Sequence, residues 1–170
     1  MTTHKIVIRK FEPADAAAVK ELIGKVLTEE FPDEAEAFTS VDLDDIESAY
    51  GKLGETFFVA CVNGRVVGTV GIKQEDSRTA LLRRLFVDSG FRGRRLGDLL
   101  ADRAIEFCRE VGYEELIFKT TSTMKNAIEL GKRKGFVPRA RLSLGSVELV
   151  KFVLFLKKEL VANHSAIHKE

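Results

Sequence analysis

Histidine is scarce in this chain of 170 residues, and none lies in its interior. The three histidines are His4, His164 and His168, all near the ends. This placement excludes a Ser-His-Asp relay and a His-Glu-x-x-His zinc site. His164 and His168 are one helical turn apart and could share a metal, but in the tail KKELVANHSAIHKE we favour a frayed, solvated helix. We therefore expect no metal site.

Cysteines and long hydrophobic runs are also lacking. Cys61 and Cys108 are too few for a disulfide framework, so we interpret them as buried thiols in a reducing compartment. The longest purely apolar stretch near the C-terminus, residues 152–156, is far too short to cross a bilayer. The first twelve residues lack the apolar segment of a signal peptide. We expect a cytoplasmic protein without membrane association.

Neither charge sign is in large excess. The chain has 27 basic and 26 acidic residues, and its net charge is +1. A surface that binds polyanions over its whole extent is therefore not expected, and a nucleic-acid-binding domain would also need aromatic side chains between its basic ones. We expect no nucleic-acid partner.

The hydrophobic periodicity predicts one α/β domain over residues 5–157 and a C-terminal tail at 158–170. Strands are expected at 5–11, 56–62, 65–73, 80–87, 115–120, 136–144 and 149–156. Helices are expected from Pro13 to about Leu27, from Asp42 or Asp44 as N-cap to near Tyr50, at 95–111 and at 124–134. Asn63-Gly64 predicts a hairpin, and the order strand–helix–strand over 80–120 predicts a parallel pair.

The segment from Leu82 to Leu100 carries the most chemical information. An apolar strand leads into Arg92-Gly93-Arg94-Arg95-Leu96-Gly97, after which an amphipathic helix begins. Unpaired N–H groups at a helix start, the helix dipole and several guanidinium groups all favour a bound anion. We predict a pyrophosphate site here; the alternative is a helix start with a basic, solvated face.

This segment resembles the acetyl-CoA-binding motif of the GNAT superfamily of N-acetyltransferases, Arg/Gln-x-x-Gly-x-Gly/Ala. Arg92 takes the first position and Gly97 the last, while Arg95 stands where the middle glycine is expected. The order of predicted elements over residues 5–157 is also that of the family. The resemblance implies a central, mostly antiparallel sheet of six to seven strands with a parallel pair at 80–87 and 115–120, flanked by about four helices. It implies cofactor binding by Leu85, Phe86, Val87, Arg92, Gly93, Arg94, Arg95, Leu96, Gly97 and Asn126.

A second match is Asn126-Ala127-Ile128-Glu129-Leu130, followed by Gly135-Phe136. By resemblance, the Asn126 amide would bond the pantetheine arm or its surroundings; the alternative is a capping or solvent-facing asparagine. We interpret Gly135 as a helix stop and Phe136 as a core residue.

The catalytic groups depart from the family pattern, and the sequence identifies no catalytic residue. The tyrosine that protonates the leaving thiolate is replaced by Gly131, and the glutamate that acts as a water-relayed base is replaced by Leu81. Thr120–Thr123 lie near the expected sulfur, but we favour turn and capping roles, with Ser122 or Thr123 as N-cap. Further candidate bases are Glu75, Asp76 and Glu148. By resemblance, the two parallel strands should splay at 85–87 and 118–120 and expose backbone N–H groups.

The identity of the acceptor stays open at this point. The region between the first two helices is acidic, which favours a cationic amine, although these residues are also typical of a solvated loop with capping aspartates. The acidic residues are Glu29, Glu30, Asp33, Glu34, Glu36, Asp42, Asp44 and Asp45. Arg139 and Arg141 could instead face a carboxylate-bearing substrate.

The resemblance predicts an acyltransferase that moves the acetyl group of acetyl-CoA to an amine of a small molecule or peptide by direct attack. Because both usual proton-transfer groups are missing, a non-catalytic CoA- or acyl-CoA-binding regulatory or sensor module is the alternative. The protein is expected to be a monomer or a homodimer formed through its final strands, although the run 152–156 would also suit an inner strand.

Overall fold

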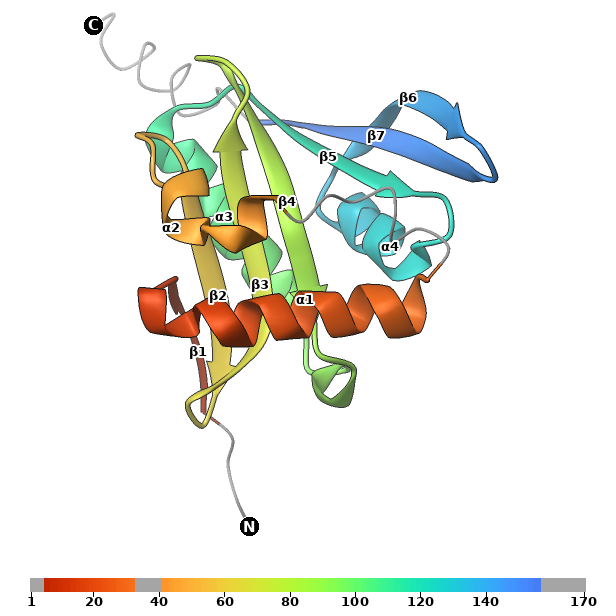
Figure 1. The fold of residues 1–170 in the computed structure, drawn as a ribbon. Coiled ribbons are helices and arrows are strands. Elements are labelled where there is room, and N and C mark those ends of the chain that lie inside the picture. The colour runs from red at the N-terminus through yellow and green to blue at the C-terminus, as the bar shows by residue number, and fades with distance from the viewer. Residues whose placement is uncertain (1–4, 33–40, 157–170) are drawn as a thin grey trace, which may run out of the picture.

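Seven strands form one mixed sheet in the computed structural model, which describes residues 5–32 and 41–156 (Figure 1). The strands are β1 (Ile6–Lys10), β2 (Thr56–Val62), β3 (Arg65–Gln74), β4 (Thr79–Val87), β5 (Glu115–Thr121), β6 (Val137–Leu144) and β7 (Val147–Phe155). Their order is β1-β2-β3-β4-β5-β7-β6. β4 and β5 run parallel and every other neighbouring pair is antiparallel, which confirms the predicted fold class.

Helices cover both faces of this sheet. The described α-helices are α1 (Ala16–Glu30), α2 (Ile46–Ala49), α3 (Leu96–Val111) and α4 (Lys125–Arg133), with 3₁₀ turns η1 (Pro13–Asp15), η3 (Val41–Asp44) and η4 (Ser89–Phe91). Figure 1 shows α1 and α2 in front of the sheet and α3 behind it. Accordingly, one buried cluster joins Ile23 and Ile46 to Phe57, and a second joins Leu100 to Phe58 on the opposite face. Among the described helices, none combines the length and apolar character needed to traverse a membrane.

Local chemistry accounts for several of these boundaries. All seven residues of β2 are buried, as expected for a strand covered on both faces. Asn63 and Gly64 connect β2 to β3 with φ values of +52° and +82°, the left-handed pair that a two-residue hairpin requires. The amphipathic α3 ends at Gly112, whose φ of +101° few other residues adopt without strain.

The predicted N-caps of α2 and α4 are wrong. The N-cap of α2 is neither Asp42 nor Asp44 but Asp45, whose carboxylate accepts a hydrogen bond from the Ser48 N–H at 3.1 Å. The N-cap of α4 is Met124, without a side-chain cap bond, rather than Ser122 or Thr123. Aspartate, serine and threonine suit caps and turns alike, so sequence alone did not separate them.

The closing hairpin starts its second strand at Val147, two residues earlier than predicted. β7 lies between β5 and β6, so the apolar residues Phe152 and Val153 belong to an inner strand and β6 forms one edge of the sheet. The predicted tail at 158–170, with its two histidines, lies outside the described residues. The expected dimer through the final strands stays a prediction.

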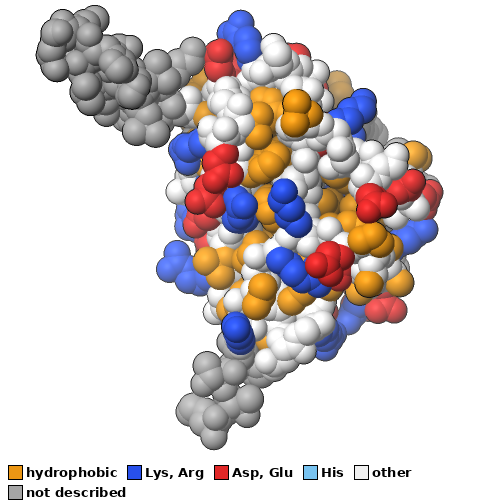
Figure 2. Space-filling view, turned by 90° about the vertical axis from the view of Figure 1, so that its left-hand side faces the viewer, with side chains coloured by type: hydrophobic (Ala, Val, Ile, Leu, Met, Phe, Trp, Pro, Cys, Tyr) orange, Lys and Arg blue, Asp and Glu red, His pale blue; other side chains and the backbone are white. Residues whose placement is uncertain are grey.

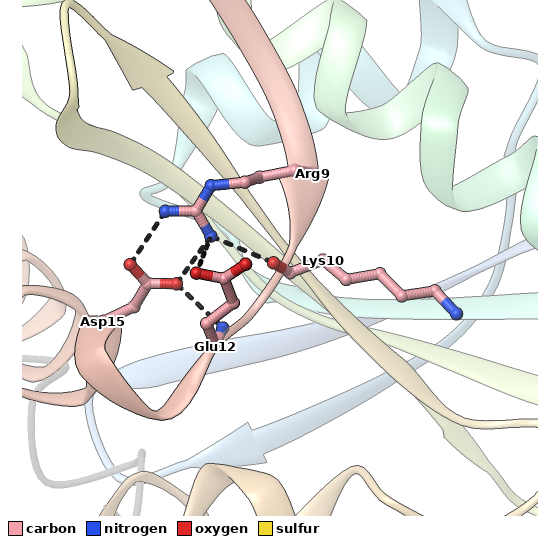
Figure 3. A network of polar contacts seen from close by, with 4 residues as sticks. All are labelled: Arg9, Lys10, Glu12 and Asp15. Atoms are coloured by element: carbon pink, nitrogen blue, oxygen red, sulfur yellow. Dashed lines mark hydrogen bonds and ion pairs between the residues drawn. The ribbon is translucent and has the colours of Figure 1, made fainter.

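A polar network fixes the start of α1 to the neighbouring strand (Figure 3). The Arg9 guanidinium on β1 donates to both Asp15 carboxylate oxygens, at 2.8 and 3.0 Å. Asp15 also accepts the Glu12 N–H at 2.8 Å, which closes a capping box around Pro13. The hydrogen bond from Arg9 outweighs the effect of burial and lowers the pKa of Asp15. The network therefore fixes the N-terminal end of α1 against β1.

Candidate active site

The loop between β4 and α3 forms a cradle of backbone N–H groups. Gly93 and Arg95 both adopt left-handed conformations, with φ values of +82° and +61°, and α3 begins at Leu96. Alternation of conformation in such a loop turns successive N–H groups toward one point. The first N–H groups of α3, including that of Gly97, have no partner within the helix, and the helix dipole adds positive potential there.

The conformation of Arg95 explains why a glycine is expected in its place. A left-handed φ costs an L-residue about 1–2 kcal/mol but costs glycine almost nothing. The loop of this chain keeps the left-handed geometry with an arginine, whose side chain is 79% exposed and lies 3.8 Å from the Asp98 carboxylate. The departure from the motif therefore changes the side chain but leaves the backbone cradle in place.

The arginines of this loop have partners within the protein. The Arg92 guanidinium donates to both carboxylate oxygens of Glu30 on α1, at 2.6 and 2.8 Å, and to the Val87 carbonyl oxygen at 3.0 Å. Arg94 lies over the ring of Phe91, with 5.2 Å between guanidinium and ring centroid. The structure therefore does not leave Arg92 or Arg94 free for an anion, and the backbone supplies the open donors.

Nine of the ten residues predicted to bind the cofactor line one cavity of about 440 Å³. They are Leu85, Phe86, Val87, Arg92, Gly93, Arg95, Leu96, Gly97 and Asn126, whereas Arg94 does not line it. Further lining comes from the C-terminal end of α1 with the following Phe31, which the sequence reasoning missed, and from α4, including Leu130 of the second motif. Asn126 lies in the first turn of α4 and faces this cavity as a lining residue.

The parallel strands diverge next to this cavity, as predicted. Their pairing runs from Thr79↔Glu115 to Leu82↔Phe118 and then stops, although both strands continue for several residues (Figure 1). A second cavity of about 300 Å³ occupies the divergence. Its lining residues are Leu81, Leu82, Arg83, Arg84, Leu85, Phe86, Ile117, Phe118, Lys119, Thr120, Met124, Ala127 and Leu149. The two cavities share Leu85, Phe86, Met124 and Ala127, so they meet at the divergence.

A buried ion pair braces β4 at the divergence. The register of β3 and β4 shifts here, and Arg84 has a φ of +57°; its carbonyl accepts a hydrogen bond from the Thr69 hydroxyl at 2.6 Å. The Arg84 guanidinium donates to both oxygens of Asp42, at 2.5 and 3.0 Å, and the Tyr50 hydroxyl donates to the same carboxylate at 2.5 Å. Burial raises the pKa of Asp42, but these hydrogen bonds outweigh it and the pKa is lowered.

The usual general acid and base are absent from their family positions. Gly131 is buried, and a Cβ there would lie 3.6 Å from the Phe118 ring. Leu81, at the position of the expected glutamate, lines the second cavity. Among the described lining residues of that cavity there is no aspartate, glutamate, histidine or tyrosine.

The other candidate proton-transfer groups have structural roles or lie elsewhere. Asp76 accepts the N–H groups of Arg78 and Thr79 in a turn, and Glu148 pairs with Arg141 at 3.0 Å. Thr120 donates to the Met124 sulfur at 3.3 Å, and of the cluster at 120–123 it alone lines the second cavity in the described structure. Glu75 is exposed beside the Asp76 turn and does not line either cavity.

Most of the described acidic residues predicted as a substrate rim have partners inside the protein. Glu30 pairs with Arg92, Asp42 with Arg84, Asp44 with Lys20, and Asp45 caps α2. Glu29 is exposed on α1, while Asp33, Glu34 and Glu36 lie outside the described residues. The predicted arginines are also occupied, because Arg141 pairs with Glu148 and Arg139 lies 5.0 Å from the Phe155 ring centroid.

Comparison with known proteins identifies relatives of one kind. The pattern of the "Acetyltransferase (GNAT) family" matches residues 20–136. "N-acetylaspartate synthetase" of Danio rerio is 40% identical over 97 residues, which is 56% of this chain and 34% of that protein. "Uncharacterized N-acetyltransferase YjgM" of Escherichia coli is 30% identical over 135 residues, 76% of this chain and 81% of that protein. The chain thus spans about a third of the length of the N-acetylaspartate synthetases that it matches.

Solved structures share the fold. A GNAT-family acetyltransferase of Staphylococcus aureus superimposes with a TM-score of 0.80 at 24% identity, covering 90% of this chain and 100% of that one. YncA of Salmonella typhimurium, solved with its cofactor acetyl-CoA, superimposes with a TM-score of 0.76 at 23% identity, covering 90% and 95%.

Proposed function

The chain belongs to the GNAT family of acetyltransferases, and we propose that it transfers the acetyl group of acetyl-CoA to an amine by direct attack. The observation that carries this proposal is the meeting of the two cavities where β4 and β5 diverge. One cavity has a cradle of N–H donors suited to a pyrophosphate, and the other is open to a second substrate. A thioester placed at their junction would be within reach of an amine from the second cavity.

Each wall of the first cavity has a role in this proposal. The N–H groups around Gly93, Leu96 and Gly97 hold the pyrophosphate of acetyl-CoA, and the Asn126 amide bonds the pantetheine arm. Leu85, Phe86 and Val87 bring the strand end alongside that arm. Arg92 supports the loop through its bond to the Val87 carbonyl, while Glu30 neutralises its charge, and Arg95 contributes charge from the outer rim.

The chemical step needs positioning more than proton transfer. The amine nitrogen forms the new C–N bond with the thioester carbonyl carbon, the C–S bond breaks, and CoA leaves as a thiolate. The nitrogen loses its proton to solvent. Beyond Leu82, the side of β4 that faces β5 carries backbone groups without a strand partner, and these polarise the carbonyl. A thiolate is a good leaving group near neutral pH, so the reaction proceeds slowly without a dedicated acid.

A non-catalytic CoA-binding module is the second candidate. Gly131 and Leu81 favour it, because they remove the usual acid and base together. Both candidate functions use the same cofactor cavity, so a measurement of acetyl transfer is needed to distinguish them.

The test combines thermal unfolding with an acceptor screen. In the wild type, acetyl-CoA at a hundred times its Kd should stabilise the fold by about 2.7 kcal/mol. Gly97→Phe should abolish this shift because the ring fills the cavity. Gly97→Ala should retain it, since a Cβ there makes only ordinary contacts with Leu130 at 3.6 Å and Val87 at 3.9 Å. Gly24→Phe, at an exposed helical glycine with open space around it, is the matched control.

The screen then measures thiol release with a panel of amines. Release with any acceptor supports the enzyme, whereas stabilisation by acetyl-CoA without release from any acceptor supports the binding module. No stabilisation of the wild type by acetyl-CoA or CoA would contradict both.

We further propose that residues 5–157 act as one catalytic domain in the cytoplasm and without nucleic acid. Cys61 and Cys108 are free and buried, which suits a reducing compartment. Basic and acidic side chains are both present over the face shown in Figure 2, with apolar surface between them, and neither sign covers the face alone. Heparin retention at moderate salt checks the absence of polyanion binding.

A further inference from the structure

The strand register brings two cations to the mouth of the second cavity. Leu82 of β4 is aligned with Phe118 of β5 at the last paired position, and both side chains belong to the core cluster on the α3 face. Alternation along a strand turns the next residues, Arg83 and Lys119, to the opposite face. Both line the second cavity, one from each diverging strand. They therefore flank the space into which the acceptor must enter.

These two cations lack the partners that neighbouring basic side chains have. Neither makes a hydrogen bond or an ion pair with another described residue. Arg83 lies in the field of Asp42, but both oxygens of that carboxylate already accept bonds from Arg84 and Tyr50. Their charges are thus available to a ligand.

A third cation increases the positive potential at the same place. Lys119 is directly opposite Lys151 in the β5–β7 ladder, so both side chains lie on one face of the sheet. Like charges directly opposite each other destabilise a sheet. A bound anion beside Lys119 would relieve this repulsion, whereas a cationic ligand would add to it.

We propose that the acceptor is a small amine that also carries a carboxylate, such as an amino acid, and that Arg83 and Lys119 bind this carboxylate. The inference rests on the proposed acetyl transfer and assigns the substrate class of that site. The apolar wall formed by Leu81, Ile117 and Leu149 contacts the carbon chain between the two charged ends. A cavity of about 300 Å³ suits a small molecule. Polyamines are rejected because their ammonium groups would meet uncompensated cations.

The experiment compares amino acids with their carboxamides, which keep the amine and lose the negative charge, and with a diamine. Acetylation rates are measured for the wild type, Arg83→Gln and Lys119→Gln. The control Arg139→Gln removes a cation that lies against the Phe155 ring and does not line the cavity. Each cavity variant should raise the KM for carboxylated acceptors about tenfold to a hundredfold, the loss typical of one charged hydrogen bond. The KM for acetyl-CoA and the rates with carboxamides should stay unchanged.

The outcomes separate this inference from the proposed function. Carboxamides or the diamine acetylated as well as the amino acids would overturn the carboxylate assignment while confirming acetyl transfer. Equal losses for all acceptors in Arg83→Gln and Lys119→Gln would also overturn it. If no acceptor is acetylated, the enzyme proposal fails. Calorimetric binding of amino acids to the CoA complex then tests the site alone, and binding to the wild type but not to Arg83→Gln supports it, whereas no binding to the wild type overturns it.

Discussion

Two groups of basic side chains lie on either side of the point where β4 and β5 diverge, and their surroundings differ. In the loop before α3, Arg92 is bonded to Glu30 and Arg94 lies over Phe91. At the mouth of the second cavity, Arg83 and Lys119 have no such partners among the described residues. The loop has the denser run of arginines in the sequence, yet the available charge lies at the strand ends. An arginine cluster therefore marks a binding loop less directly than the backbone conformation that accompanies it.

Arg84 lies between these groups and differs from both. Its side chain is 3% exposed, and the carboxylate of Asp42 that neutralises it is 9% exposed. A buried ion pair contributes little net stability when it is intact, but removal of one partner leaves a charge without compensation. Arg84 therefore has a structural role, because its ion pair with Asp42 holds η3 against β4, the strand that carries Arg83.

The largest expected effect comes from breaking this buried pair. Asp42→Asn should lower the free energy of unfolding by about 3–5 kcal/mol because it leaves the Arg84 charge buried and unneutralised. Asp44→Asn is the matched control in the same 3₁₀ turn. Its partner Lys20 is 55% exposed, so the loss should stay below about 1 kcal/mol. Urea denaturation measures the free energy of unfolding of both variants. Equal losses would show that the unneutralised Arg84 charge carries no extra free-energy cost.

The pH dependence of stability provides a second test of the Asp42–Arg84 pair. The pKa of Asp42 is lowered in the folded protein, so its contribution to stability is present above its unfolded pKa of about 4 and is lost as the pH falls through the folded value. The wild type should therefore lose stability below about pH 4. Asp42→Asn should lose less over that range, because the titrating group is gone.

A smaller effect is expected where a paired cation of the loop is released. Glu30→Gln removes the carboxylate that neutralises Arg92 beside the first cavity. The freed guanidinium should strengthen acetyl-CoA binding a few-fold, and the gain should shrink as salt increases. Glu29→Gln, a neighbouring exposed glutamate that does not line the cavity, is the control. Weaker binding by Glu30→Gln would mean that the ion pair holds the loop in its binding conformation.

Sequence reasoning succeeded where short-range chemistry determines the structure. The Asn63-Gly64 turn, the length of α3 and its stop at Gly112 follow from local conformational preference and periodicity. It failed where a side chain has a distant partner. Asp42 was predicted as a cap, but it bonds Arg84, 42 residues away. The juxtaposition of Arg83 with Lys119 was missed for the same reason, since only the β4–β5 register places them together. Neither strand sequence, read by itself, carries a signal of that pairing.

The smallest expected effect concerns the backbone cradle itself. Arg95→Gly restores the glycine of the motif at a φ of +61° and removes the left-handed strain of about 1–2 kcal/mol. Part of this gain is offset by the larger conformational entropy of glycine in the unfolded chain, about 0.4–1 kcal/mol. The variant should therefore be as stable as the wild type or up to about 1 kcal/mol more stable. Acetyl-CoA affinity should change by less than about twofold, because the side chain is largely exposed.

Arg94→Gly is the control at an adjacent position without positive φ, and it should destabilise the fold by about 0.5–1 kcal/mol. Denaturant unfolding and calorimetric titration measure both variants. A large loss of acetyl-CoA affinity in Arg95→Gly would show that its guanidinium, rather than the cradle of N–H groups, binds the pyrophosphate.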